Sequence, residues 1–386
     1  MSDAAGATGP RTPGPGGPDT VDWDLAVTTA ERLVRPGPAV TRDEARAVVA
    51  DLHRHAVAAQ RHVRDVTGLH APAGGASGVA VIDRPGWVRA NAAGFRTLLE
   101  PLAEVLKEKR GGRTSALAQA VGPRVTAVET GALLAFLSGK VLGQYELFPP
   151  WGGDADPGAA PAGRLLLVAP NVVQAERDMG VDPRDFRLWV CVHEETHRVQ
   201  FGAVPWLRTH LVGEVRALVE ATDVDPAVLL RRLRTAAGAV GDALRAGPEA
   251  APDGGTSLLE AVQSPRQREV LDRITALMSL LEGHADVVMD AVGPAVIPSV
   301  AQIRERFQRR REGSGRLDVA LRRLLGLDAK MRQYRDGARF VEGVVARVGM
   351  DGFNTVWTSP ETLPTRAELA DPAAWVARTG PRRIGA

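Results

Sequence analysis

One stretch of the sequence constrains the fold more than any other: residues 182–204, which read DPRDFRLWVCVHEETHRVQFGAV. Asp182 is a residue type that caps helix N-termini, and Pro183 suits the first helical position because an N–H there would have no helical partner. Apolar side chains then recur at helical spacing, with Phe186 and Trp189 on one face. The pattern predicts a helix whose apolar face packs into the protein core.

Two histidines lie on that same face. His193 and His197 are four residues apart, so their side chains leave a helix in the same direction and can reach one metal ion. Glu194 follows the first histidine, and in metalloproteases a glutamate at this position takes a proton from the attacking water. The H-E-x-x-H pattern therefore predicts Zn²⁺ bound by His193 and His197, with Glu194 as general base. The alternative is a pair of hydrogen-bonded histidines on an amphipathic helix that binds no metal.

A catalytic zinc ion usually has three protein ligands and one position open to water. The extended pattern H-E-x-x-H-x-x-G-x-x-H is absent, because Gln200 stands at the glycine position and the next histidine is His210. A later Glu-x-x-x-Asp pattern offers Glu282 as the third ligand. Asp286, one helical turn on, would hydrogen-bond the far nitrogen of a ligating histidine and fix its tautomer. Alternatively, these two carboxylates lie on a solvated helix edge.

Four further residues are alternative candidates. His284 lies on the same predicted helix, roughly 160° around the axis from the two carboxylates, so it should point away from their site. His210, Tyr334 and Arg335 are candidate donors to the oxygen that gains charge in a transition state. A structural role explains each of these three more simply, as for a packed tyrosine whose hydroxyl is hydrogen-bonded.

Helix signals dominate the rest of the chain. Thr41 and Glu44 form a capping box, and Ser264 followed by Pro265 opens the helix that carries Glu282. The run RLLLVAP is short, apolar and bounded by turn residues, so it predicts a strand. The expected fold class is α+β, predominantly helical, with a small sheet.

The organisation expected along the chain is simple. Residues 1–19 are rich in Gly and Pro and should form a disordered tail. Residues 20–386 should form a single large domain, with an N-terminal helical part at 20–130 and a metal-site part at 131–386.

Composition and charge narrow the classes of partner. Hydrophobic residues make up 44% of the chain and charged residues 24%, as in a soluble globular protein. The net charge is only +2 and the two signs are interleaved, so no nucleic-acid partner is expected, and the basic cluster at 304–316 is interpreted as a solvated helix face. The sequence has no secretory signal pattern, no apolar run of membrane-spanning length and a single cysteine, Cys191. We therefore expect a cytoplasmic protein with no membrane contact; its oligomeric state is not predicted.

Six segments between residues 82 and 345 act together as a signature: APNVVQAERDMGVDPRDFRLWVCVHEETHRVQF, VPWLRTHL, LEGHADVVMD, IDRPGWVRAN, LSGKVLGQYELF and AKMRQYRDGARFVEGVV. As a set they resemble an actinobacterial family of uncharacterised zincin-like hydrolases, grouped with zinc-dependent metalloproteases. One branch of that family is associated, by genomic context, with biosynthesis of a deazaflavin coenzyme.

The resemblance implies a zincin-like fold, zinc on His193 and His197, Glu194 as the base and Glu282 at the position of the third ligand. It also implies an edge strand above the active helix that pairs with an extended substrate, and RLLLVAP is the strand expected there. The predicted function is a zinc-dependent hydrolase, metallopeptidase-like, acting on a peptide or a small amide. Two alternatives stay open: a catalytically inactive zincin-like binding or scaffold protein, and a small-molecule amidohydrolase linked to deazaflavin coenzyme metabolism.

Overall fold

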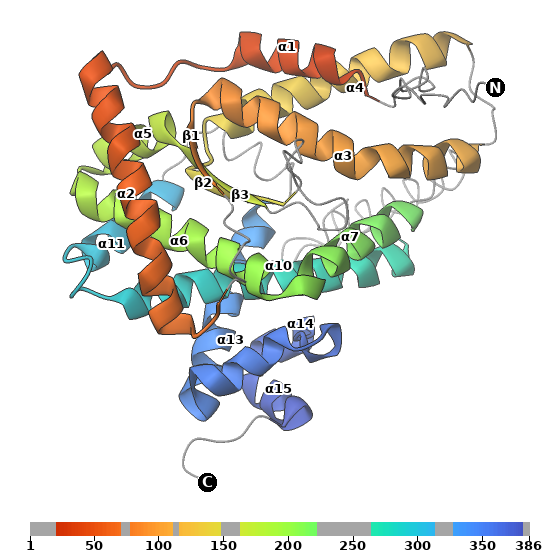
Figure 1. The fold of residues 1–386 in the computed structure, drawn as a ribbon. Helices are drawn as coiled ribbons and strands as arrows, with labels where there is room; N and C mark the ends of the chain where they lie inside the picture. The colour runs from red at the N-terminus through yellow and green to blue at the C-terminus, as the bar shows by residue number, and fades with distance from the viewer. Residues whose placement is uncertain are drawn as a thin grey trace, which may run out of the picture.

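The computed structural model describes residues 21–70, 78–110, 116–147, 163–221, 264–312 and 327–380, with side chains throughout these ranges except at 100–110, 116–122, 311–312 and 327–335. The tail predicted at residues 1–19 lies outside the described residues. Helices make up most of the described chain, and one three-stranded sheet lies among them (Figure 1). The predominantly helical α+β class predicted from the sequence is confirmed.

The described elements follow one another along the chain as α1 (Trp23–Leu33), α2 (Arg42–Thr67), β1 (Val79–Ile82), α3 (Arg84–Arg110), α4 (Ala116–Ser138), β2 (Gly143–Glu146), β3 (Arg164–Val168), α5 (Ala169–Met179), α6 (Pro183–Ala203), α7 (Pro205–Glu220), α10 (Pro265–Val292), α11 (Val300–Glu312), α13 (Leu327–Phe353), the 3₁₀ turns η1 (Asn354–Trp357) and η2 (Pro360–Thr362), α14 (Arg366–Ala370) and α15 (Pro372–Thr379).

The sheet has the strand order β1-β3-β2. β1 pairs with β3 in parallel, and β2 pairs with β3 antiparallel, with Gly143 opposite Leu167. The prediction of a strand at RLLLVAP is confirmed by β3, but the prediction that it forms the edge strand is wrong. Both edges of β3 are already hydrogen-bonded to neighbours, and its residues from Leu165 to Val168 are all buried. A strand covered on both faces reads as a continuous apolar run, which hides its central position from sequence reasoning.

The short strand β2 has one neighbour within the described part of the sheet, and it packs against α6. In Figure 1, α1, α3 and α4 lie above the sheet, whereas α6 and α10 lie below it. This arrangement leaves β2 as the strand that lies closest to the predicted active helix.

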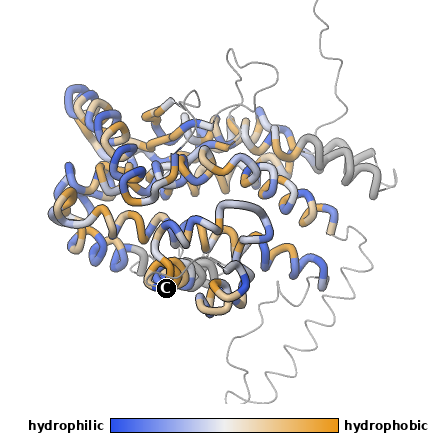
Figure 2. The backbone as a smooth tube through the Cα atoms, turned by 60° about the horizontal axis from the view of Figure 1, so that its bottom comes forward, coloured by the Kyte–Doolittle hydropathy of each residue, from blue (hydrophilic) through white to orange (hydrophobic). Residues whose placement is uncertain are grey.

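Three apolar clusters hold these layers together. One joins β3, α2, α5, α6 and the C-terminal end of α10; a second joins α7, α10, α13 and the C-terminal turns; a third joins α1, α3 and α4 around Trp23 and Trp87. Figure 2 shows apolar and polar stretches alternating along the helices, as expected when each helix buries one face.

The predicted start of α6 is confirmed. Asp182 caps the helix by accepting a hydrogen bond from the backbone N–H of Asp185 at 2.9 Å, and Pro183 occupies the first turn. The capping box at Thr41 and Glu44 is confirmed at the start of α2. These local signals fix where the helices begin.

Helix α10 begins as predicted, with Ser264 capping it and Gln267 completing a capping box. It packs closely on α13, because Gly283 and Gly337 lie at the crossing and a Cβ atom on either would overlap backbone atoms of the other helix. The same helix packs against α6 on another side, where Glu282 faces His193 and His197.

The basic residues of α11 have partners on the protein itself. Arg304 pairs with Asp290 at 2.6 Å, and Arg306 donates to the carbonyl oxygen of Met179 at 2.6 Å. Residues 313–316 of the predicted basic cluster lie outside the described residues. No helix in the described ranges combines the length and apolar character that a bilayer crossing requires.

Candidate active site

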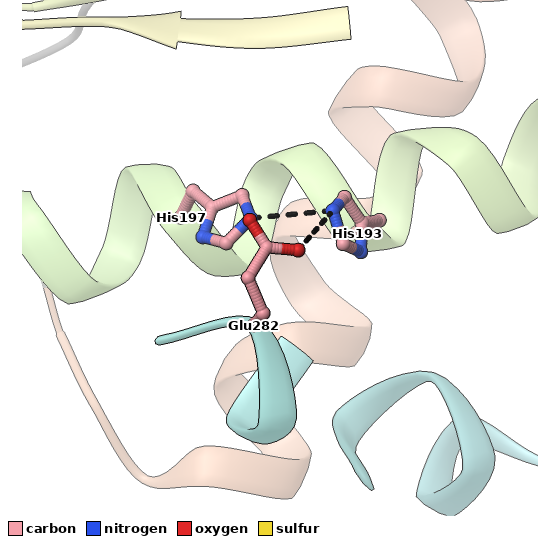
Figure 3. A group of neighbouring side chains, drawn as sticks. All are labelled: His193, His197 and Glu282. Carbon is pink, nitrogen blue, oxygen red and sulfur yellow. Dashed lines mark hydrogen bonds and ion pairs between the residues drawn. The ribbon is translucent and has the colours of Figure 1, made fainter. Parts of the chain in front are cut away.

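The two histidines of α6 and a glutamate of α10 converge on one point (Figure 3). The Nε2 atoms of His193 and His197 are 3.2 Å apart. Glu282 reaches them from the facing helix, with its carboxylate oxygens 3.8 Å from His193 Nε2 and 3.7 Å from His197 Nε2. The three candidate ligand atoms all lie within 4.8 Å of one another, so the residues predicted as ligands are brought together.

This donor set fits a zinc ion. Two imidazole nitrogens and one carboxylate oxygen are ligand types that zinc prefers, and a catalytic site uses three of them. Donors bound tetrahedrally at 2.0–2.1 Å would be roughly 3.4 Å apart. The 3.2 Å separation of the two Nε2 atoms is close to that spacing, and the carboxylate oxygens lie only slightly further away.

Glu194, the predicted base, is buried beside this cluster, with 6% of its surface exposed. Gly143 of β2 lies directly against it: a Cβ atom at that position would be 2.5 Å from Glu194 Cγ and 2.7 Å from Cδ. Burial raises the pKa of the Glu194 carboxyl well above its usual value, and the negative charge of Glu282 raises it further. Such a perturbed carboxyl beside a cluster of metal-ligand residue types marks a candidate functional site.

A cleft of about 450 Å³ opens beside these side chains. Its lining consists of Lys140, Val141, Leu142, Gly143, Trp189, Val190, His193, Glu194, Glu282, Asp286, Met289 and Phe307. The lining therefore combines two candidate ligands, His193 and Glu282, and the candidate base with several apolar side chains. A larger hollow of about 810 Å³ lies near the start of α3 and includes none of the candidate residues.

Gln200 holds the far side of His197. Its Oε1 atom is 2.9 Å from His197 Nδ1, and its Nε2 atom is 3.0 Å from the carbonyl oxygen of Leu281 and 2.9 Å from His284 Nδ1. The Nδ1 atom of His193 lies instead 3.3 Å from Met289 Sδ. These contacts connect the candidate ligands to the surrounding core.

The remaining candidates lie at different places. Asp286 lines the cleft beside Glu282, and its role toward a histidine stays a prediction. His284 is fully buried outside the cluster and stacks on Phe353 at 5.2 Å; burial lowers its pKa to about 3, so it is neutral. His210 packs edge-on against Trp206 in α7. The side chains of Tyr334 and Arg335 lie outside the described residues.

Sequence reasoning missed two residues of this site. Gly143 is far from Glu194 in the sequence, and a glycine in a short strand gives no sign of which side chain it adjoins. Gln200 offered a weak signal, since it is three residues after His197 and therefore shares its helix face.

The chain is similar to a protein of solved structure. The crystal structure of a putative hydrolase with a novel fold from Chloroflexus aurantiacus is similar to this chain, with 30% identity, a TM-score of 0.64, and coverage of 94% of this chain and 99% of that one. No curated protein matches the chain. The family model of zincin-like metallopeptidases matches residues 21–376, so the chain belongs to the zincin-like metallopeptidase family.

Proposed function

We propose that this protein is a zinc-dependent hydrolase that cleaves an amide bond, in a peptide or in a small amide. The observation that carries the proposal is the placement of Glu194: a buried carboxylate, directly beside a His193–His197–Glu282 cluster, at the wall of a cleft. A carboxylate within reach of a water molecule and a scissile carbonyl is the group that amide hydrolysis requires as its base.

His193, His197 and Glu282 would hold the metal. When bound, zinc supplies Lewis-acid polarisation and lowers the pKa of water near neutrality. Glu194 would accept a proton from the attacking water and pass it to the leaving nitrogen, since it borders the cleft together with His193 and Glu282. Gly143 would admit the carboxyl to this position, because a side chain there would overlap it.

The apolar side chains that line the cleft support a substrate with an apolar group near the scissile bond. Trp189 and Phe307 meet there edge-to-face, with ring centroids 5.0 Å apart. A cleft of about 450 Å³ is within the usual range for small-molecule sites, so a small amide fits as well as a peptide segment. A link to deazaflavin coenzyme metabolism stays a prediction from the family resemblance.

The test is the variant Glu194→Gln. Its activity is measured as the amine groups released when it is incubated with a mixture of peptides or with a panel of acyl amides. We expect turnover to fall by about 10²–10⁴-fold, because a general base contributes that much. Zinc content and thermal stability should match wild type. Glu305→Gln, an exposed glutamate of α11, is the matched control and should retain full activity.

The alternative, a catalytically inactive binding protein, leads to a different expected result. Wild-type protein loaded with zinc would then release no amine from any substrate, and Glu194→Gln would change nothing. Full activity in Glu194→Gln would equally contradict the assignment of the base.

A further inference from the structure

The Gln200 side chain makes three polar contacts beside the cluster. It lies on α6, three residues after His197, and none of its surface is exposed. A buried amide is costly unless its hydrogen-bonding groups are paired, so its three contacts are obligatory rather than incidental.

The carbonyl oxygen of Leu281 fixes which way this amide points. A carbonyl oxygen can only accept a hydrogen bond, so the Gln200 atom 3.0 Å from it must be the NH₂ group. The same NH₂ group then donates its second hydrogen to His284 Nδ1 at 2.9 Å. The Oε1 atom is therefore the one that faces His197.

The orientation of the amide in turn determines the tautomer of His197. Oε1 can only accept, so His197 Nδ1, 2.9 Å away, must carry the proton and donate it. In the neutral ring, Nε2 then has a free lone pair, and it faces His193 Nε2 and the Glu282 carboxylate. A neutral imidazole with its lone pair turned into the cluster is the form that ligates a metal.

The same amide also ties α6 to α10. Leu281 immediately precedes Glu282 in sequence, so the hydrogen bond to its carbonyl oxygen holds the backbone next to the third candidate ligand. His284, the other acceptor, packs against two aromatic rings, with its centroid 5.2 Å from that of Phe353 and 5.5 Å from that of Trp357. Gln200 thus connects a histidine of one helix with the carboxylate-bearing turn of the other.

We propose that Gln200 is a positioning residue of the metal site, which sets the Nδ1–H tautomer of His197 and fixes the turn of α10 that carries Glu282. The proposal rests on the proposed zinc-binding function. It assigns to a neutral amide the work that a carboxylate or a backbone carbonyl performs for many ligating histidines.

The test compares Gln200→Met with Gln200→Glu. Methionine has nearly the same length but offers no strong acceptor, so His197 should lose its tautomer preference and zinc affinity should fall by about 10–100-fold. Glutamate keeps an acceptor for His197 Nδ1 and loses only the donors, so the tautomer should persist and zinc affinity should exceed that of Gln200→Met. Ser279→Ala is the matched control on α10, since its hydroxyl donates to the carbonyl oxygen of Thr275 in the same helix.

Two readouts are needed. The tautomer is read from histidine ¹⁵N chemical shifts in metal-free protein, with His197→Gln to assign the signal. Zinc affinity is read by competition with a chromogenic chelator at a temperature well below the melting point of every variant. Ser279→Ala should match wild type in both.

If Gln200 had only a packing role, zinc affinity should be lower in Gln200→Glu than in Gln200→Met, because burying a carboxylate costs more free energy than burying a thioether. Zinc affinity that is lower in Gln200→Glu than in Gln200→Met, or a tautomer unchanged in Gln200→Met, would overturn the proposal. Failure of the zinc function is distinguishable: wild type would then bind no zinc, which overturns the metal role, while the ¹⁵N shifts of metal-free protein still decide whether Gln200 sets the tautomer.

Discussion

Two adjacent glutamates on α6 illustrate how differently its two sides are used. Glu194 and Glu195 are both buried, and their side chains leave the helix in different directions. Glu195 is completely enclosed and forms a two-bond ion pair with Arg198, one bond being 2.7 Å from Arg198 Nε to Glu195 Oε2. Glu194 has no hydrogen bond or ion pair to any described residue, and it borders the cleft.

The surroundings of each carboxylate determine what it can do. A buried ion pair with good geometry fixes local structure, and its carboxylate is committed to its partner. The buried Glu194 carboxylate packs against Gly143 and has no cation partner among the described residues, so its oxygens stay available to a substrate. One side of α6 is therefore structural, and the other is suited to chemistry.

The largest stability effect is expected from Glu195→Gln. Arg198 has only 11% of its side chain exposed, so removing its partner leaves a buried charge unpaired. The free energy of unfolding should fall by about 3–5 kcal/mol, as measured by urea titration. The double variant Glu195→Leu with Arg198→Leu should recover most of the loss, because it removes both charges. If Glu195→Gln were as stable as wild type, the structural role assigned to Glu195 would be contradicted.

Gly143→Ala should affect the other side of the helix. The three atoms nearest to the new Cβ atom all belong to Glu194, so the substitution should displace that carboxyl before any candidate ligand. Displacement of a catalytic group by about 1 Å costs about 10²-fold in rate, so turnover should fall by that amount with zinc content unchanged. Gly78→Ala is the control, since a Cβ atom there would meet no atom within 4 Å. Normal turnover in Gly143→Ala would show that this contact does not position Glu194.

Asp182→Ala should have the smallest effect of the three substitutions, and it should not act selectively on either the Glu194 side or the Glu195 side of α6. The variant removes the cap at the start of α6, and loss of such a cap costs about 1 kcal/mol. Unfolding measurements should show that loss, and Asp182→Asn should restore stability because asparagine caps equally well. Zinc content and turnover should stay at wild-type values well below the melting temperature; a selective loss of either would mean that the cap also controls the site.

Local signals explain why much of the fold was predictable. The caps at Thr41, Asp182 and Ser264 depend on residues within one helical turn, so they can be read directly from the sequence. The i, i+4 spacing of His193 and His197 likewise follows from helix geometry alone. The convergence of Glu282 on them was predicted only through a motif, because it depends on how α10 crosses α6.

Tertiary contacts explain what was missed. The central position of β3 depends on which strands flank it, and an apolar run gives no information on that. The contact of Gly143 with Glu194 depends on β2 lying over α6. Gln200 stands at the glycine position of the extended H-E-x-x-H-x-x-G-x-x-H pattern, which gives no information on its hydrogen bond to the backbone of another helix.

The metal content of the purified protein tests the central claim most directly. Elemental mass spectrometry on tag-free wild type, His193→Ala and Glu282→Ala should give near-stoichiometric zinc in wild type and a marked loss in both variants, because each removes one of three ligands. A loss in His193→Ala alone would mean that the third ligand is not Glu282. Wild-type protein that holds no zinc, even after zinc is supplied, would contradict the metal site and leave α6 as a core helix.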